Sequence, residues 1–69
     1  MKTFGQRLRE VRESRGYNAK AFAPEVKVSL SSLSQYENDI SYPSMSKLAF
    51  IFKKLDITPE EFFKGVELL

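Results

Sequence analysis

The segment from Lys27 to Asp39, KVSLSSLSQYEND, concentrates side chains that exchange hydrogen bonds. The serine hydroxyls and the amide of Gln35 can both donate and accept. Serine is a poor helix former, so helix propensity alone does not explain four serines within thirteen residues. The segment is therefore either a soluble linker or a helix in which each position has a separate task, with hydrogen bonding as its chemistry.

Catalytic and metal chemistry finds little support in the rest of the composition. The chain contains no histidine and no cysteine, which removes the commonest general base, the commonest metal ligand and any thiolate site. No pair of carboxylates stands in a recognisable catalytic arrangement, and so short a chain has little room for a pocket. We expect no enzyme, no cofactor, no metal and no small-molecule substrate.

Length and composition predict one globular domain over residues 1–69. The chain is 42% hydrophobic and 29% charged, and its six Phe and three Tyr supply apolar area for a core. No apolar run approaches the roughly 18 residues of a membrane span, and the N-terminus does not resemble a signal peptide. We expect a cytoplasmic protein with no membrane partner.

The first two of five expected helices are marked by caps and apolar spacing. The first opens at Thr3 with the capping-box pattern TFGQ and ends at Gly16. The second begins at Asn18 and has Phe22, Ala23 and Val26 on its apolar face; because it contains Pro24, it is expected to be short, kinked or partly 3₁₀.

The opening segment is expected to form the third helix. Ser29 is a good N-cap, Val28 before it can pack against Leu33, and Leu33 shares the inward face with Tyr36. Pro43 and Ser44 start the fourth helix. The fifth opens with ITPE, in which Thr58 caps and Pro59 takes the first helical position. The chain is therefore expected to be all-α, a compact five-helix domain.

Short segments spread along the whole chain resemble the Xre-type, phage-repressor-like family of DNA-binding domains. The resemblance runs from about Phe4 to Phe63 and is carried by the order and spacing of RLREVRESRG, FA, VKVS, LSQYEND, YPSMSKL and LDITPEEFF. It implies a lambda repressor-like fold in which the second and third helices form a helix-turn-helix. It also implies a sequence-specific DNA-binding transcriptional regulator, expected to be a repressor, with double-stranded DNA as its partner.

The resemblance assigns base contacts to the third helix, about 29–38, which would enter the major groove. The matching positions are Ser29, Leu30, Ser31, Ser34 and Gln35. Gln35 can pair with adenine through two hydrogen bonds, serine can bond several bases, and Leu30 can pack on a thymine methyl. The alternative is a solvated face without a ligand.

Other positions are assigned to the DNA backbone or to the domain's own stability. The candidate phosphate contacts are Asn18, Lys20, Lys27, Asn38, Tyr42 and Ser44; each basic one among them is alternatively an ordinary surface charge. The family pairs an acid with a first-helix arginine, and the matching residues are Glu37 and Arg12. We expect this pair to be partly buried and structural.

Three departures from the family pattern weaken the expected DNA binding. Ala19 replaces a glutamine that usually begins the second helix, Asp39 replaces a glycine after the third, and residues 28–46 contain no Lys or Arg. A homodimer on a pseudo-palindromic operator would compensate. Its candidate surface is Phe63, Val66, Leu68 and Leu69; these residues could equally fold back on the core or pack against a domain absent from this chain.

Two functions therefore remain in competition. Ser29, Gln35 and the charge of the first 27 residues, where seven Lys/Arg against three Glu give +4, favour DNA binding. Ala19 and the uncharged third helix favour a protein–protein interaction module, such as an antirepressor or antitoxin. DNA binding is the leading hypothesis.

Overall fold

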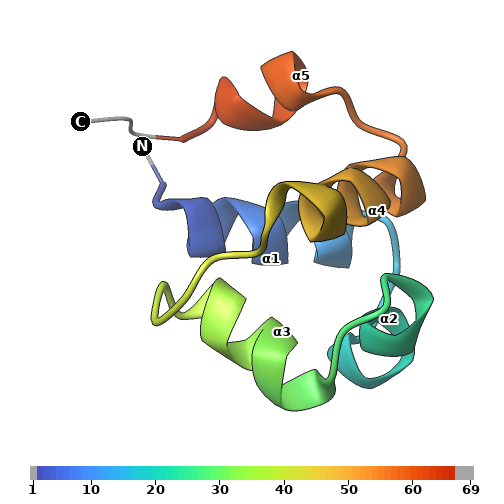
Figure 1. Cartoon of the computed structure of the whole chain (residues 1–69). Helices are drawn as coiled ribbons and strands as arrows, with labels where there is room; N and C mark the ends of the chain where they lie inside the picture. Colours follow the sequence, from blue (N-terminus) through green and yellow to red (C-terminus); the bar gives the residue numbers. More distant parts are fainter. Residues whose placement is uncertain (1, 67–69) are drawn as a thin grey trace.

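The computed structural model describes residues 2–66, and all the regular structure in this range is helical apart from one isolated bridge. The helices are α1 (Phe4–Ser14), α2 (Ala19–Glu25), α3 (Leu30–Glu37), α4 (Met45–Leu55) and α5 (Pro59–Phe63) (Figure 1). The bridge joins Lys2 to Val66 and brings the two ends of this range together. The predicted all-α, five-helix fold is confirmed. Within these residues, none of the helices is both long and apolar enough to span a membrane.

Each helix is preceded by a residue whose side-chain oxygen caps its N-terminus. The oxygens accept hydrogen bonds from the backbone N–H three residues further on, which satisfies a donor that the helix leaves unpaired; the capping residues are Thr3, Asn18, Ser29, Ser44 and Thr58. Thr3 and Gln6 form the predicted reciprocal capping box. Local sequence signals therefore determine where every helix starts.

Several turns depend on left-handed backbone. Gly16 has φ 81° after α1, as expected for a glycine cap. Lys27, Asp39 and Asp56 also have positive φ, at 66°, 59° and 54°. This conformation costs roughly 1–2 kcal/mol in a residue that carries a Cβ. Contacts elsewhere in the fold must therefore hold these three turns.

Pro24 lies in the last turn of α2, which is a short α-helix of seven residues. The missing N–H of Pro24 would have bonded the carbonyl of Lys20, which belongs to an exposed residue. The helix ends one residue after Pro24, so little helix remains to be disturbed. Phe22, Ala23 and Val26 are buried, as their spacing predicted.

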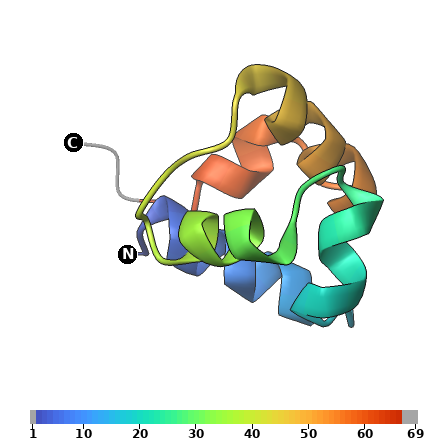
Figure 2. The same cartoon turned by 60° about the horizontal axis from the view of Figure 1, so that its bottom comes forward.

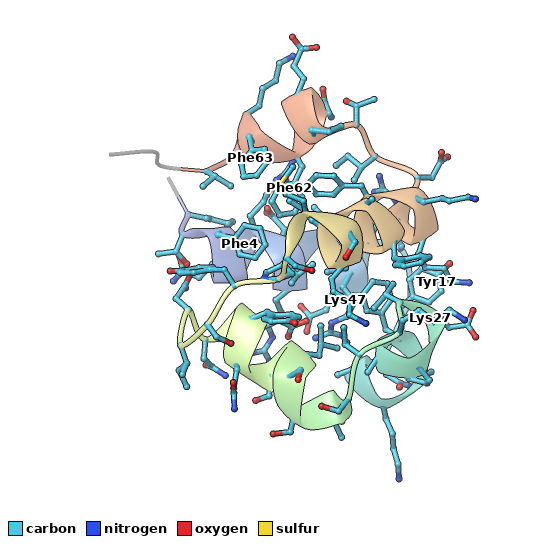
Figure 3. The ribbon with its side chains drawn as sticks, viewed as in Figure 1. Phe4, Tyr17, Lys27, Lys47, Phe62 and Phe63 are labelled. Carbon is cyan, nitrogen blue, oxygen red and sulfur yellow. The ribbon has the colours of Figure 1, made fainter. Side chains whose placement is uncertain are left out.

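The core lies between the helices and is closed at one end by aromatic rings. Its largest fully buried side chains are Phe22, Phe62, Leu8, Leu33, Ile51, Leu55 and Val26. Phe4, Phe62 and Phe63 gather where α1, α4 and α5 meet (Figure 3), with the centroids of Phe4 and Phe62 5.5 Å apart. This apolar cluster packs α1, α4 and α5 against one another, and α2 and α3 contribute their buried residues to the same core.

Arg7 of α1 and Arg15, the C-cap residue just after α1, bind the ends of other helices. The Nε of Arg7 donates to the Phe62 carbonyl at 2.9 Å and its Nη2 to the Glu61 carbonyl at 3.0 Å. The Nε of Arg15 donates to the Leu55 carbonyl at 2.9 Å. These carbonyls belong to the last turns of α5 and α4, where a helix runs out of its own N–H donors. Part of the basic charge in the first 27 residues is thus used inside the fold.

The N-terminus of α1 fits tightly against the C-terminus of α3. A Cβ on Gly5 would lie 2.5 Å from the Glu37 carbonyl oxygen and 2.6 Å from that of Tyr36, so only glycine allows this approach. Asp39 fastens the same junction, because its carboxylate accepts from the Thr3 hydroxyl at 2.6 Å and from the Gly5 N–H at 3.0 Å. These contacts offset the left-handed backbone of Asp39, and they fix α3 on α1.

Candidate nucleic-acid interface

The third helix presents one face to the core and the other to solvent. Leu33 is fully buried, and Tyr36 packs against the core. Leu30, Ser31, Ser34 and Gln35 are exposed, Leu30 with 46% of its surface. Figure 2 shows α3 across this side of the molecule, with α2 beside it. The serines of the segment KVSLSSLSQYEND therefore lie mostly outside the core.

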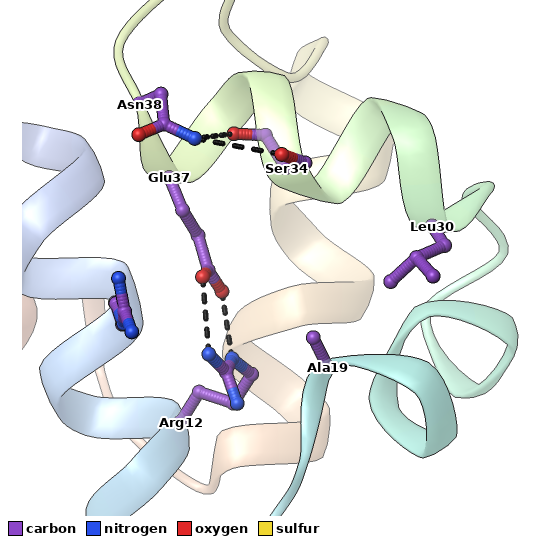
Figure 4. Close-up of a pocket in the computed structure, with 7 residues that line it drawn as sticks. Arg12, Ala19, Leu30, Ser34, Glu37 and Asn38 are labelled. Atoms are coloured by element: carbon purple, nitrogen blue, oxygen red, sulfur yellow. Dashed lines mark hydrogen bonds and ion pairs between the residues drawn. The ribbon is translucent and has the colours of Figure 1, made fainter.

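A buried ion pair ties α3 to α1 from beneath. The Nε of Arg12 lies 2.7 Å from Oε2 of Glu37, and its Nη2 lies 3.1 Å from Oε1 (Figure 4). The remaining Nη1 donates to the Tyr17 carbonyl at 2.7 Å. The two side chains are only 6% and 9% exposed. The hydrogen bond to Glu37 raises the pKa of Arg12 above its ordinary value and outweighs the opposing effect of burial.

A hollow of about 360 Å³ opens above this pair. It is lined by Arg9, Arg12, Ala19, Leu30, Ser34, Glu37 and Asn38 (Figure 4). The short side chain of Ala19 borders it, at the position where the family usually has a glutamine. Arg9 is an exposed cation beside α3 that sequence reasoning missed, because it lies on α1, where no local signal connects it with the third helix.

The four serine and glutamine residues among the five base-contact candidates differ in how far their polar groups are already bonded within the chain. Ser29 accepts from the Ser32 N–H at 3.0 Å and donates to the Ser32 hydroxyl at 3.0 Å, so its first task is to cap α3. Ser34 faces Asn38, whose Nδ2 lies 3.4 Å from its hydroxyl. Oε1 of Gln35 accepts from the Ser41 hydroxyl at 3.2 Å, a partner that sequence reasoning also missed.

Among the candidate phosphate contacts, the polar groups of four are already bonded within the chain. Asn18 and Ser44 cap α2 and α4, Asn38 donates to the Ser34 carbonyl at 2.8 Å, and the Tyr42 hydroxyl donates to Asp39 at 3.3 Å. All four of these residues remain exposed. An N-cap still presents the neighbouring helix N–H groups, which suit a phosphate.

Lys20 and Lys27 are the two candidates with a full charge to offer. Both are exposed, and within residues 2–66 no carboxylate lies within salt-bridge distance of either ammonium group. Lys27 occupies the turn between α2 and α3, and its carbonyl accepts from Nζ of Lys47 at 2.6 Å (Figure 3). Lys47 thereby helps to hold the left-handed turn of the helix-turn-helix.

The expected dimer surface is placed only in part. Val66 is 4% exposed and belongs to the core of this chain, so it is not free to contact a second copy. Phe63 is half-buried and borders an apolar hollow of about 310 Å³, which is lined by Met45, Leu48, Ala49, Phe52, Pro59 and Phe63. Leu68 and Leu69 lie outside the described residues.

Comparison with known proteins agrees with this arrangement. Residues 5–68 match the family model of a helix-turn-helix domain. Over 66 residues the chain is 29% identical to the HTH-type transcriptional activator BcrR of Enterococcus faecalis, an alignment that covers 96% of this chain and 32% of that protein. The chain thus spans about a third of the length of this relative. On the family match, the chain belongs to the helix-turn-helix domain family, within the Xre and lambda repressor-like group.

Proposed function

We propose that this chain is a sequence-specific DNA-binding domain of a transcription regulator and that α3 reads base edges in the major groove. The observation that carries the proposal is the outward face of α3, where Leu30, Ser31, Ser34 and Gln35 are exposed together at the front of a helix-turn-helix. The major groove is about 12 Å wide and admits an α-helix. Short serine side chains let the helix backbone approach the bases closely.

The electrostatic part of the binding is weak. Among residues 28–46 there is no Lys or Arg, and Arg7, Arg12 and Arg15 are bonded inside the fold. Arg9 is exposed beside α3 but is paired with Glu13 at 3.3 Å, so Lys20 and Lys27 supply most of the unpaired charge that meets phosphate. Two such contacts give a salt dependence with a slope of about −2 in log K against log salt. Base contacts must then contribute a large share of the affinity.

A homodimer on a pseudo-palindromic operator is part of the proposal, because two half-sites combine weak single-domain energies. The apolar hollow beside Phe63 is the part of the predicted dimer surface that supports it. Repression is the expected direction of regulation. A domain bound over a promoter blocks RNA polymerase by occupying the DNA, and it needs no second surface for contact with the polymerase. The named relative is an activator, so a reporter assay with the operator upstream and then over the promoter decides the direction.

The proposal is tested by selecting duplexes from a random pool and measuring the affinity of the enriched sequence by fluorescence anisotropy. Lys20→Ala and Lys27→Ala should weaken binding to all duplexes and lower the salt slope by about one each. Gln35→Ala should instead lose about 1–3 kcal/mol, and only for sequences with the preferred base. Lys64→Ala is the matched control, because it removes an exposed charge just after α5 and should change neither quantity.

A protein–protein interaction module is the second candidate function, and it is favoured because Arg7, Arg12 and Arg15 are bonded inside the fold. The same experiment separates the two functions. If no duplex is enriched even at low salt, the exposed face of α3 is better explained as a contact surface for a protein.

A further inference from the structure

Gln35 is an exposed side chain that is nevertheless held in place. Its Oε1 accepts a hydrogen bond from the Ser41 hydroxyl at 3.2 Å, and within residues 2–66 this is its one side-chain hydrogen bond. Glutamine has several rotatable torsions and loses much rotamer freedom when it is immobilised. A partner that orders it before any ligand arrives reduces that loss on binding.

Ser41 is suited to this task because its own segment is fastened on both sides. The preceding Asp39 bonds Thr3 and Gly5 at the start of α1, and the following Tyr42 bonds Asp39 at 3.3 Å and packs edge-on against Phe4.

The backbone of the same segment also returns to α3. The N–H groups of Ile40 and Ser41 donate to the Gln35 carbonyl, at 2.9 and 3.5 Å. Ser41 is half-buried in this turn. The turn therefore carries the rigidity of the α1–α3 junction to the Gln35 side chain.

The opposite side of α3 offers no comparable support. Ala19 of α2 faces the hollow beside Leu30 and Ser34 and has no group that could bond an amide (Figure 4). The other side-chain hydrogen bonds of the outward face link residues of α3 or its caps to each other, Ser29 with Ser32 and Asn38 with Ser34. Orientation of Gln35 thus depends on the turn that follows α3.

We propose that Ser41 is a positioning residue that determines base discrimination by Gln35. The proposal rests on the proposed function, in which α3 reads DNA. An amide oxygen has two lone pairs, so Oε1 can accept from Ser41 and still accept from the amino group of adenine while Nε2 donates to the ring nitrogen. Loss of the hydroxyl frees the amide to rotate and to bond other bases, so discrimination at that base pair falls.

A double-mutant cycle on the enriched duplex and on its single-base variants tests this role. Ser41→Ala should lower discrimination at the base pair read by Gln35 about three- to tenfold, as expected for one hydrogen bond of ordinary net strength. Ser41→Ala should leave binding to random duplex and the melting temperature unchanged. Ser41→Thr, which keeps a hydroxyl, should discriminate between bases as the wild type does. In the Gln35→Ala background, Ser41→Ala should have no further effect.

Other outcomes overturn the proposal in distinguishable ways. Equal weakening by Ser41→Ala on every duplex, persisting in the Gln35→Ala background, would show that Ser41 contacts the DNA backbone itself. Unchanged discrimination in Ser41→Ala, together with a loss in Gln35→Ala, would remove Ser41 from base reading and leave the proposed function standing. If wild-type protein prefers no duplex at all, the proposed function fails and the role of Ser41 fails with it.

Discussion

Glu37→Ala strands a charge in the interior of the domain. The Arg12 side chain is 6% exposed, and Glu37 provides two of its three hydrogen-bonded contacts, at 2.7 and 3.1 Å. After the substitution, the guanidinium keeps the Tyr17 carbonyl as its one hydrogen-bond acceptor within residues 2–66, with the largely exposed carboxylate of Glu13 at the longer distance of 4.0 Å. The space left by the carboxylate adjoins the hollow beside Ala19, so water can enter but cannot replace a negative charge.

The expected loss is large for so small a chain. Removing one partner of a buried ion pair costs about 3–5 kcal/mol. A domain of this length has a total stability of roughly 3–10 kcal/mol. Each kcal/mol shifts the melting temperature by about 4–8 °C in this size range. Glu37→Ala should therefore lower the melting temperature by at least about 12 °C, or leave the domain unfolded at room temperature.

Thermal and urea denaturation followed by circular dichroism measures this effect. Arg12→Met combined with Glu37→Leu removes both charges and should be less destabilising than Glu37→Ala alone. Lys64→Ala breaks an exposed pair with Glu61, in which the side chains are 71% and 62% exposed, and should change little. A melting temperature of Glu37→Ala within about 3 °C of wild type would refute the reasoning, since that corresponds to less than about 1 kcal/mol.

Three further substitutions test the turns and the α1–α3 junction. Gly5→Ala should destabilise by about 1–3 kcal/mol in urea denaturation, because the new Cβ meets the Tyr36 and Glu37 carbonyls; an unchanged midpoint would contradict this close packing. Lys27→Gly should raise stability by about 1 kcal/mol, because it relieves φ 66°, while it weakens binding to all duplexes. The Thr3 hydroxyl, aided by the Gly5 N–H and opposed by partial burial, holds the pKa of Asp39 below its ordinary value. Its contribution is therefore complete above the unfolded-state pKa of about 4 and is lost as pH falls through the lower folded-state value. Asp39→Asn should flatten the acid end of the stability profile, and an identical profile would exclude this linkage.

Local signals were sufficient to predict where each helix begins. Thr3, Asn18, Ser29, Ser44 and Thr58 cap the five helices because each can bond an N–H three residues away, which is a property of the local sequence. The inward face of α3 was predictable for the same reason, since helical spacing places Leu33 and Tyr36 together. The outward face of α3 was then predictable as the residues that do not point to the core.

Contacts between distant segments were not predictable in this way. Asp39 looked like a poor substitute for glycine, but its carboxylate bonds Thr3 and Gly5, 36 and 34 residues away, and glycine could not do this. The basic residues in and just after α1 looked like a DNA-binding charge, yet Arg7 and Arg15 bind carbonyls of α5 and α4. Neither role has a periodicity or spacing that reveals it before the helices are packed.

The central claim, that the outward face of α3 meets DNA, is tested most directly by backbone amide shifts in NMR spectra as enriched duplex is added. We predict that the largest shifts fall on Ser31, Ser34 and Gln35 and on the start of α2 around Lys20. Amides around Met45 and Phe63, beside the apolar hollow, should shift only if DNA binding brings two copies together there. Largest shifts around Met45 and Phe63, with α3 unchanged, would contradict the account and place the contact on α4 and α5.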